Sequence, residues 1–192
     1  MPDDSIMDRI YLAIGRTCDW WSTIEHLVHD ICLHLAECLS TDFSQSVTRL
    51  PIHIALSNMD FRERIATAKA FASQAPTAAA DFYSRLESLL NRLDNELRSE
   101  RNRYIHDLWM ANEQGSGFVR FQQRTIVTRP QSRELDLQIG TKKTFGTVEE
   151  IEAFVTILED MYHKLVTIDN ETATMASDLM RLEVLRKSVL LV

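Results

Sequence analysis

Glycine and proline are scarce in this sequence, and long apolar runs are absent. Only five glycines and four prolines occur among the 192 residues, and such a composition favours helices over turn-rich folds. Because no apolar run approaches the length of a membrane span, we expect no membrane insertion. The acidic N-terminus, Met-Pro-Asp-Asp, lacks the basic and apolar regions of a signal peptide. We therefore expect a soluble, cytoplasmic protein.

Positive charge and cysteine are also limited. The formal net charge is −7, which argues against broad electrostatic coating of nucleic acid but leaves room for a small basic site. The three cysteines, Cys18, Cys32 and Cys38, have no CxxC spacing and lie within one helical pattern. We predict buried thiols in a reducing cytosol rather than disulfides or a zinc knuckle.

Several enzyme templates are missing. The sequence has no P-loop, no GxSxG, no GxGxxG after a predicted strand and no HExxH. The adjacent acids Glu159 and Asp160 suggest a carboxylate pair, but neighbours in a helix point about 100° apart. A solvated helix edge is therefore the stronger interpretation of these two residues.

Apolar residues recur at three- and four-residue steps in the first half of the chain and predict long amphipathic helices. The predicted helices cover about 5–39, 60–72 with Asp60 as the cap, and 78–111. The segment 40–59 contains Pro51, and we predict a connection there with a short turn of helix at most.

The period changes after the third helical pattern. Four of the five glycines lie between 115 and 146, which is typical of turns and strands rather than helices. Strands are predicted at 118–121, 125–127 and 135–139, around a turn at 129–131. We therefore predict a β-hairpin inserted at about 117–140.

Two further helices are predicted after the hairpin. Thr147 followed by Glu150 is a capping-box pattern, so one helix should begin there and end near Asp169, and a last helix should cover about 171–190. No repeat or linker divides the chain. We expect one domain over 1–192 that is mainly α, an up-and-down bundle of four or five helices with an inserted β-hairpin.

A polar segment interrupts the apolar stripe late in the third predicted helix. Arg101 falls on the stripe itself, four residues after Leu97 and four before Ile105. Asn102 and His106 stand one turn apart and share a face. A partly buried arginine beside a histidine is costly unless an anion meets it. That anion is either a structural carboxylate or a phosphate, and the two alternatives lead to different functions.

The string Arg101-Asn102-Arg103-Tyr104-Ile105-His106 resembles the R-x4-6-H motif of the HEPN superfamily, in which a polar residue directly follows the arginine. The setting is also similar, with a helical bundle and the motif late in its third long helix. The resemblance implies a metal-independent endoribonuclease, often a toxin or antiviral effector, that uses no cofactor. It also implies a homodimer with both motifs in one cleft, single-stranded RNA as the substrate, and an antitoxin protein as a further partner.

The residue types suit the roles that the resemblance implies. His106 would be the acid/base, because imidazole transfers protons near neutral pH. Arg101 would hold the phosphate with its planar fork, and Asn102 would position it. Arg103 would add a phosphate contact or face solvent. Trp109, three residues after His106, is predicted to be a core or interface anchor that borders the cleft.

One position departs from a pattern found in related toxins. Those silenced by nucleotidylation carry a tyrosine two residues after the histidine, where this sequence has Leu108, so we do not expect that regulation. Tyr104 lies inside the motif and is predicted to pack. The alternative function is a non-catalytic HEPN-like module that binds a nucleotide or a protein, in which Arg101 and His106 form only a helix-end polar network.

Glu25 interrupts the apolar stripe of the first predicted helix, four residues after Trp21 and three before Val28. A buried glutamate needs a cation. We predict that Arg101 or His106 supplies it and that the pair orients the motif. The alternative is a partly exposed acid at the margin of the stripe.

Histidines and acids on the first predicted helix raise a metal-site hypothesis. A catalytic zinc usually takes three ligands from more than one element, whereas these candidates fan around one helix and only His53 and His163 could join them from elsewhere. Surface or half-buried histidines are the stronger interpretation. The candidates are His26, His29, His34 and Asp30.

Overall fold

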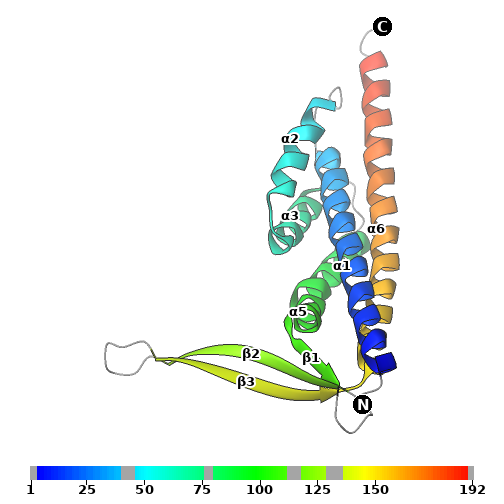
Figure 1. Cartoon of the computed structure of the whole chain (residues 1–192). Helices are drawn as coiled ribbons and strands as arrows, with labels where there is room; N and C mark the ends of the chain where they lie inside the picture. The colour runs from blue at the N-terminus through cyan, green and yellow to red at the C-terminus, as the bar shows by residue number, and fades with distance from the viewer. Residues whose placement is uncertain (1–3, 40–45, 76–79, 112–117, 129–135, 190–192) are drawn as a thin grey trace. The chain divides into compact units, whose positions relative to one another are not determined.

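The computed structural model describes residues 4–39, 46–75, 80–111, 118–128 and 136–189, drawn as helices, strands and connections in Figure 1. The predicted fold class is confirmed, because helices make up most of this part of the chain and a β-hairpin is inserted before the last helix. The elements are α1 (Asp4–Leu39), α2 (Ser46–Ser57), α3 (Phe61–Gln74), α4 (Ala80–Arg92), the π-helical turn η1 (Leu93–Leu97), α5 (Arg98–His106), β1 (Leu108–Ala111), β2 (Phe118–Thr128), β3 (Asp136–Gly146) and α6 (Val148–Val189).

The chain forms two compact units. Unit 1 comprises Met1–Asp19 and Arg98–Leu158, and unit 2 comprises Trp20–Leu97 and Glu159–Val192. The predicted motif therefore belongs to unit 1, while Glu25 and the histidines of α1 belong to unit 2. The single domain over 1–192 stays a prediction.

Unit 2 is a helical unit built around the apolar stripe of α1. The Trp21 ring meets the Phe61 ring edge-on, with centroids 5.1 Å apart, and the Trp20 ring contacts Tyr162 at 5.1 Å. Side chains from α1, α2, α3, α4, η1 and α6 close this core. The fully or nearly fully buried members include Trp21, Ile24, Val28, Ile31, Leu35, Leu56, Ile65, Leu86, Leu90, Leu93, Met161, Leu165 and Ile168.

The start of α3 follows from a local signal. The Asp60 carboxylate accepts a hydrogen bond from the Glu63 backbone N–H at 2.8 Å, and the Glu63 carboxylate accepts one from the Asp60 N–H at 2.8 Å. This reciprocal capping box satisfies two donors that a helix start leaves unpaired. The predicted cap at Asp60 is confirmed.

Unit 1 combines one end of α1, helix α5, the sheet and the first part of α6. Arg9 on α1 forms ion pairs with Glu149 and Glu152 on α6, at 3.2 and 2.9 Å. The sheet is antiparallel in the order β1-β2-β3. The core side chains of unit 1 come from α1, α5, β1 and α6. They include Ile10, Ala13, Tyr104, Trp109, Val148, Ile151, Phe154 and Leu158.

The helix predicted to run to residue 111 ends earlier. The Asp107 backbone N–H donates to the Arg103 carbonyl at 3.2 Å as the last turn of α5 closes. The next four residues form β1, which pairs with β2 from Leu108↔Phe121 to Ala111↔Phe118. The prediction was wrong because a four-residue apolar run fits a helix or a strand equally well, and only its pairing partner decides.

Two further boundaries differ from the prediction. Segment 46–57 forms a three-turn helix, α2, with Pro51 inside it; proline removes one hydrogen bond, but Leu56 is buried and holds the helix in place. Helix α6 is continuous through Asp169, where a break was predicted. The side chain of His34 bonds to Asp169 and Thr172 is buried, so tertiary contacts stabilise this polar stretch.

The hairpin is longer than predicted. Strands β2 and β3 pair over eleven positions, from Phe118↔Gly146 to Thr128↔Asp136, beyond the predicted limits of 117–140. The predicted turn at 129–131 lies outside the described residues. In this antiparallel ribbon, each strand supplies the hydrogen-bond partners of the other.

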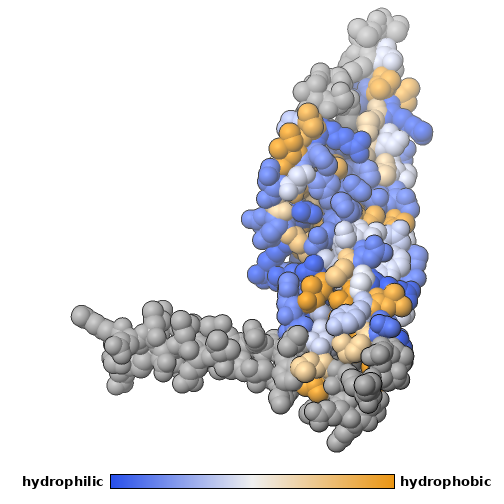
Figure 2. All heavy atoms as spheres, in the orientation of Figure 1, coloured by the Kyte–Doolittle hydropathy of each residue, from blue (hydrophilic) through white to orange (hydrophobic). Residues whose placement is uncertain are grey.

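One of the three cysteines that were predicted to be buried is exposed. Cys18 is exposed, whereas Cys32 and Cys38 are buried as expected; Cys18 lies off the apolar stripe because it follows the buried Thr17 by one position. Figure 2 shows an apolar area over α2, where Leu50 and Ile54 are exposed. Among the described helices, none is both long and apolar enough to cross a membrane.

Candidate functional site

Helix α5 carries all three predicted catalytic residues. Arg101 and Asn102 are half-buried and His106 is exposed. The Nη1 atom of Arg101 donates a hydrogen bond to Oδ1 of Asn102 at 2.9 Å. This hydrogen bond limits where the guanidinium can lie, and a guanidinium is a donor that suits anionic oxygen atoms.

Arg103 lies on the solvent side of α5. Its Nη1 atom donates to the Glu100 carboxylate at 2.7 Å, and both side chains are about one-third exposed or more. The sequence left open whether Arg103 contacts phosphate or faces solvent. In the structure its side chain is exposed and paired with Glu100. An anion that approaches Arg103 would have to compete with an acid of the same helix.

Tyr104 and Trp109 form a buried aromatic pair beneath the motif. Their rings stack with centroids 5.7 Å apart and an interplanar angle of 16°. Trp109 Nε1 donates to the Tyr104 carbonyl at 2.9 Å, and the Tyr104 ring contacts Phe154 on α6 at 5.0 Å. Burial, together with the Glu100 carboxylate, raises the pKa of Tyr104 to about 12. Tyr104 therefore packs and stays neutral.

Arg120 on β2 completes this group, and no sequence motif had pointed to it. Its guanidinium carbon lies 5.9 Å from the Tyr104 ring centroid and 5.8 Å from that of Trp109. Its Nε atom lies 3.2 Å from Asp107 Oδ2, and the Arg120 and Asp107 side chains are only 16% and 8% exposed. Burial raises the pKa of Asp107, while the positive charge of Arg120 opposes that rise.

Glu25 lies in unit 2 and is half-buried. Its Oε1 atom accepts a hydrogen bond from Trp21 Nε1 at 2.7 Å, one turn earlier on α1. The tryptophan thus provides a donor for a carboxylate on the apolar stripe. The proposed pairing of Glu25 with Arg101 or His106 joins two units and stays a prediction.

The histidines of α1 make separate contacts in unit 2. His29 Nε2 lies 2.7 Å from His53 Nδ1 on α2, and His34 Nδ1 lies 2.9 Å from Asp169 Oδ1 on α6. His26 and His163 are exposed, as is Asp30. Within the part of the chain that the structure describes, no group of three or more histidine, cysteine or acidic side chains could hold a metal ion.

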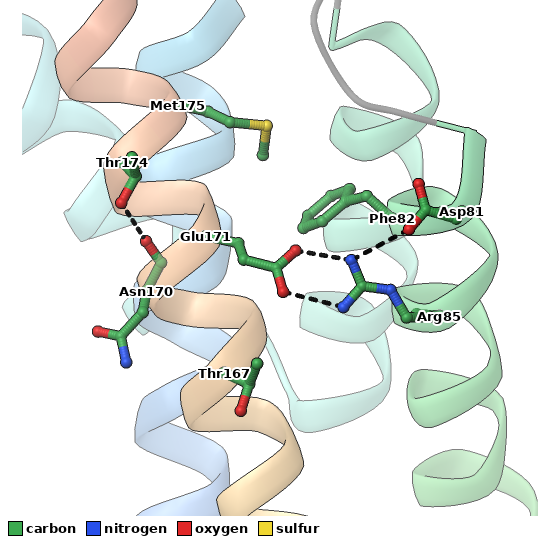
Figure 3. Close-up of a pocket in the computed structure, with 8 residues that line it drawn as sticks. All are labelled: Asp81, Phe82, Arg85, Thr167, Asn170, Glu171, Thr174 and Met175. Carbon is green, nitrogen blue, oxygen red and sulfur yellow. Dashed lines mark hydrogen bonds and ion pairs between the residues drawn. The ribbon is translucent and has the colours of Figure 1, made fainter.

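A hollow lies between α4 and α6, with a volume of about 540 Å³. Arg85 spans it and donates to both carboxylate oxygens of Glu171, at 2.9 and 2.7 Å, with Asp81 3.5 Å away. Figure 3 shows the Arg85 and Glu171 side chains meeting across the gap, beside Phe82 and Met175. Because two acids already engage the guanidinium, this hollow is a bridge between helices rather than a ready anion site.

Comparison with known proteins adds no relatives. No family model matches the chain, and no match was found among the curated proteins or the solved structures. The α5 motif and the residues around it are therefore the features that bear on function.

Proposed function

We propose that this protein is a metal-independent endoribonuclease of the HEPN type, acting on single-stranded RNA in the cytoplasm as a toxin or antiviral-defence effector. The observation that carries the proposal is the composition of α5, where Arg101 is hydrogen-bonded to Asn102 and the exposed His106 follows one turn later. RNA cleavage through the 2′-hydroxyl requires proton transfer, which the imidazole can supply, and charge stabilisation at the phosphate, which the cationic fork can supply.

In the proposed reaction the 2′-oxygen of one nucleotide attacks the adjacent phosphorus, and the bond from phosphorus to the 5′-oxygen of the next nucleotide breaks. His106 takes the proton from the 2′-hydroxyl or gives a proton to the leaving oxygen. Arg101 stabilises the negative charge on the phosphate oxygens, and Asn102 fixes the direction of the guanidinium. The products are a 2′,3′-cyclic phosphate and a 5′-hydroxyl.

The proposed reaction also calls for a homodimer. One imidazole cannot be base and acid in the same step, whereas two copies of the motif in one cleft supply both. A C2 dimer places the same patch of each subunit against its mate. In this proposal the partners of the protein are therefore a second copy of the chain, an RNA strand, and an antitoxin that would cover the cleft.

The test is cleavage of a labelled single-stranded RNA by the purified protein in EDTA. We expect cyclic-phosphate ends from the wild type. His106→Ala should lower the rate roughly 10²–10⁴-fold, and Arg101→Ala roughly 10²–10³-fold. His163→Ala is the matched control, because His163 is an exposed histidine of unit 2.

Two results would overturn the proposal. One is intact RNA after incubation with a folded wild type, and binding without cleavage would then favour the non-catalytic nucleotide- or protein-binding module. The other is equal cleavage by the wild type and His106→Ala, which would identify a contaminating nuclease.

A further inference from the structure

The last turn of α5, which carries His106, is held by residues of the sheet. Asp107 follows His106 directly, and its backbone N–H closes the turn on Arg103 at 3.2 Å. The indole N–H of Trp109, on β1, donates a hydrogen bond to the Tyr104 carbonyl at 2.9 Å. The backbone carbonyls of Arg103 and Tyr104, near the end of α5, therefore both accept a hydrogen bond.

Arg120 adds a connection from β2. Its guanidinium stands about equally far from the Tyr104 and Trp109 rings, at 5.9 and 5.8 Å, within the outer range of a cation–π contact. It also lies beside Asp107, with 3.2 Å between Nε and Oδ2. One side chain thus contacts the residue after His106 and both aromatic anchors of the same turn.

The ion pair is poorly suited to a purely stabilising role. Arg120 Nε and Asp107 Oδ2 are buried, and although they are 3.2 Å apart they do not meet hydrogen-bond geometry. A buried charge pair with imperfect geometry adds little net stability, because desolvation offsets the attraction. The pair does constrain geometry, because each charge limits where the other side chain can lie.

We propose that Arg120 is a positioning residue for His106: by holding Asp107 and the Tyr104–Trp109 stack, it fixes the end of α5 so that the imidazole has one orientation. The inference rests on the proposed nuclease function. Arg120 is not itself the phosphate ligand, because its side chain is 16% exposed and is already engaged by a carboxylate and two rings. That role belongs to Arg101.

The experiment compares Arg120→Gln with Arg120→Lys, and uses Arg9→Gln as the matched control. Arg9 is an arginine of the same unit whose ion pairs join α1 to α6. For Arg120→Gln we expect kcat on RNA to fall roughly 10–100-fold, as small misplacements of a reacting group do, while KM stays within about twofold. Arg120→Lys keeps the cation beside Asp107 and should recover part of kcat.

A second readout does not depend on catalysis. In NMR spectra of protein with ¹⁵N-labelled histidine, the His106 ring signals should shift or double in Arg120→Gln and stay in place in Arg9→Gln. If Arg120→Gln fails to fold, as far-UV circular dichroism would show, the near-isosteric Asp107→Asn removes the same charge pair and takes its place.

The outcomes separate the two proposals. Unchanged His106 signals in a folded Arg120→Gln variant would overturn the positioning role, and so would an unchanged kcat in an enzyme that cleaves RNA. A wild type that cleaves no RNA would overturn the nuclease, and the His106 signals would then still show whether Arg120 orients the ring.

Discussion

His29 and His53 share a hydrogen bond between helices α1 and α2, with Nε2 of the first 2.7 Å from Nδ1 of the second. The two rings meet edge to face, at an interplanar angle of 87°. His29 is 8% exposed, and His53 is exposed. Such a bond needs at least one neutral ring to accept the proton of the other, so the attachment of α2 depends on pH.

The first prediction concerns stability in mild acid. Burial lowers the pKa of His29 from its ordinary 6.5, and the positive charges of His53, Arg64 and His26 lower it further against the opposing charge of Asp30. The unfolded chain therefore binds the proton more tightly. The contribution of His29 to the free energy of unfolding is complete above pH 6.5 and is lost as pH falls through the folded pKa.

Urea unfolding between about pH 8 and about pH 5 tests this prediction. His29→Gln keeps a polar group near the Nε2 position and should reduce the loss of stability on the acid side. His163→Gln, at an exposed position, should leave that loss unchanged. An acid-side loss of equal size in the wild type and His29→Gln would show that this histidine is not responsible.

The second prediction is a loss of stability as pH rises, not as it falls. The hydrogen bond to Asp169 raises the pKa of His34 from 6.5, although burial opposes the rise. Because the folded state binds this proton more tightly, the stabilisation is complete below pH 6.5 and is lost as pH rises through the folded pKa. Asp169→Asn should therefore destabilise the protein by about 1–2 kcal/mol near pH 6 and by less near pH 8. Equal destabilisation at both pH values, measured by urea unfolding, would contradict it.

The third prediction concerns thiol reactivity. Burial raises the pKa of Cys32 to about 12 and that of Cys38 to about 11, whereas Cys18 is exposed. Since the thiolate is the reactive form, a thiol reagent should modify one cysteine rapidly in the folded protein and all three in urea. Cys18→Ser should abolish the rapid phase, and its persistence would mean that a buried thiol is accessible.

The fourth prediction uses two neighbouring leucines of α4. Leu90 is fully buried, at 0% exposure, and Leu89 is half-buried. Leu90→Ala should lower the free energy of unfolding by roughly 2–5 kcal/mol, because a cavity adds to the lost apolar transfer. Leu89→Ala should cost about 1 kcal/mol or less. Urea midpoints at an unchanged slope measure both values, and similar losses in the two variants would contradict the burial difference.

The parts of the fold that were predicted correctly depend on local signals. The apolar stripe of α1 gave a helix over about 5–39, against Asp4–Leu39 in the structure. Asp60 with Glu63, and Thr147 with Glu150, marked two helix starts that the structure has. These signals work at short range because a helix pairs each backbone group with one four residues away.

The parts that were missed depend on distant partners. The four residues of β1 become a strand because β2 pairs with them. Helix α2 forms despite Pro51 because its Leu56 is buried and its His53 bonds to His29. The polar stretch around Asp169 continues α6 because His34 lies beside it. In each case the local sequence fits two structures almost equally well, and a tertiary contact of about 1 kcal/mol decides between them.

The candidate site divides in the same way. The order of residues alone placed Arg101, Asn102 and His106 on one short helical segment, since helical spacing fixes which side chains are neighbours. Arg120, thirteen residues after Asp107 in the sequence and on a strand, could be found only in the folded chain. The antiparallel register pairs it with Trp109 and so brings its charge to Asp107. Local periodicity determined the helices and the motif, and the pairing of distant segments decided how that motif is held, because only folding brings such segments within the few ångströms over which side chains interact.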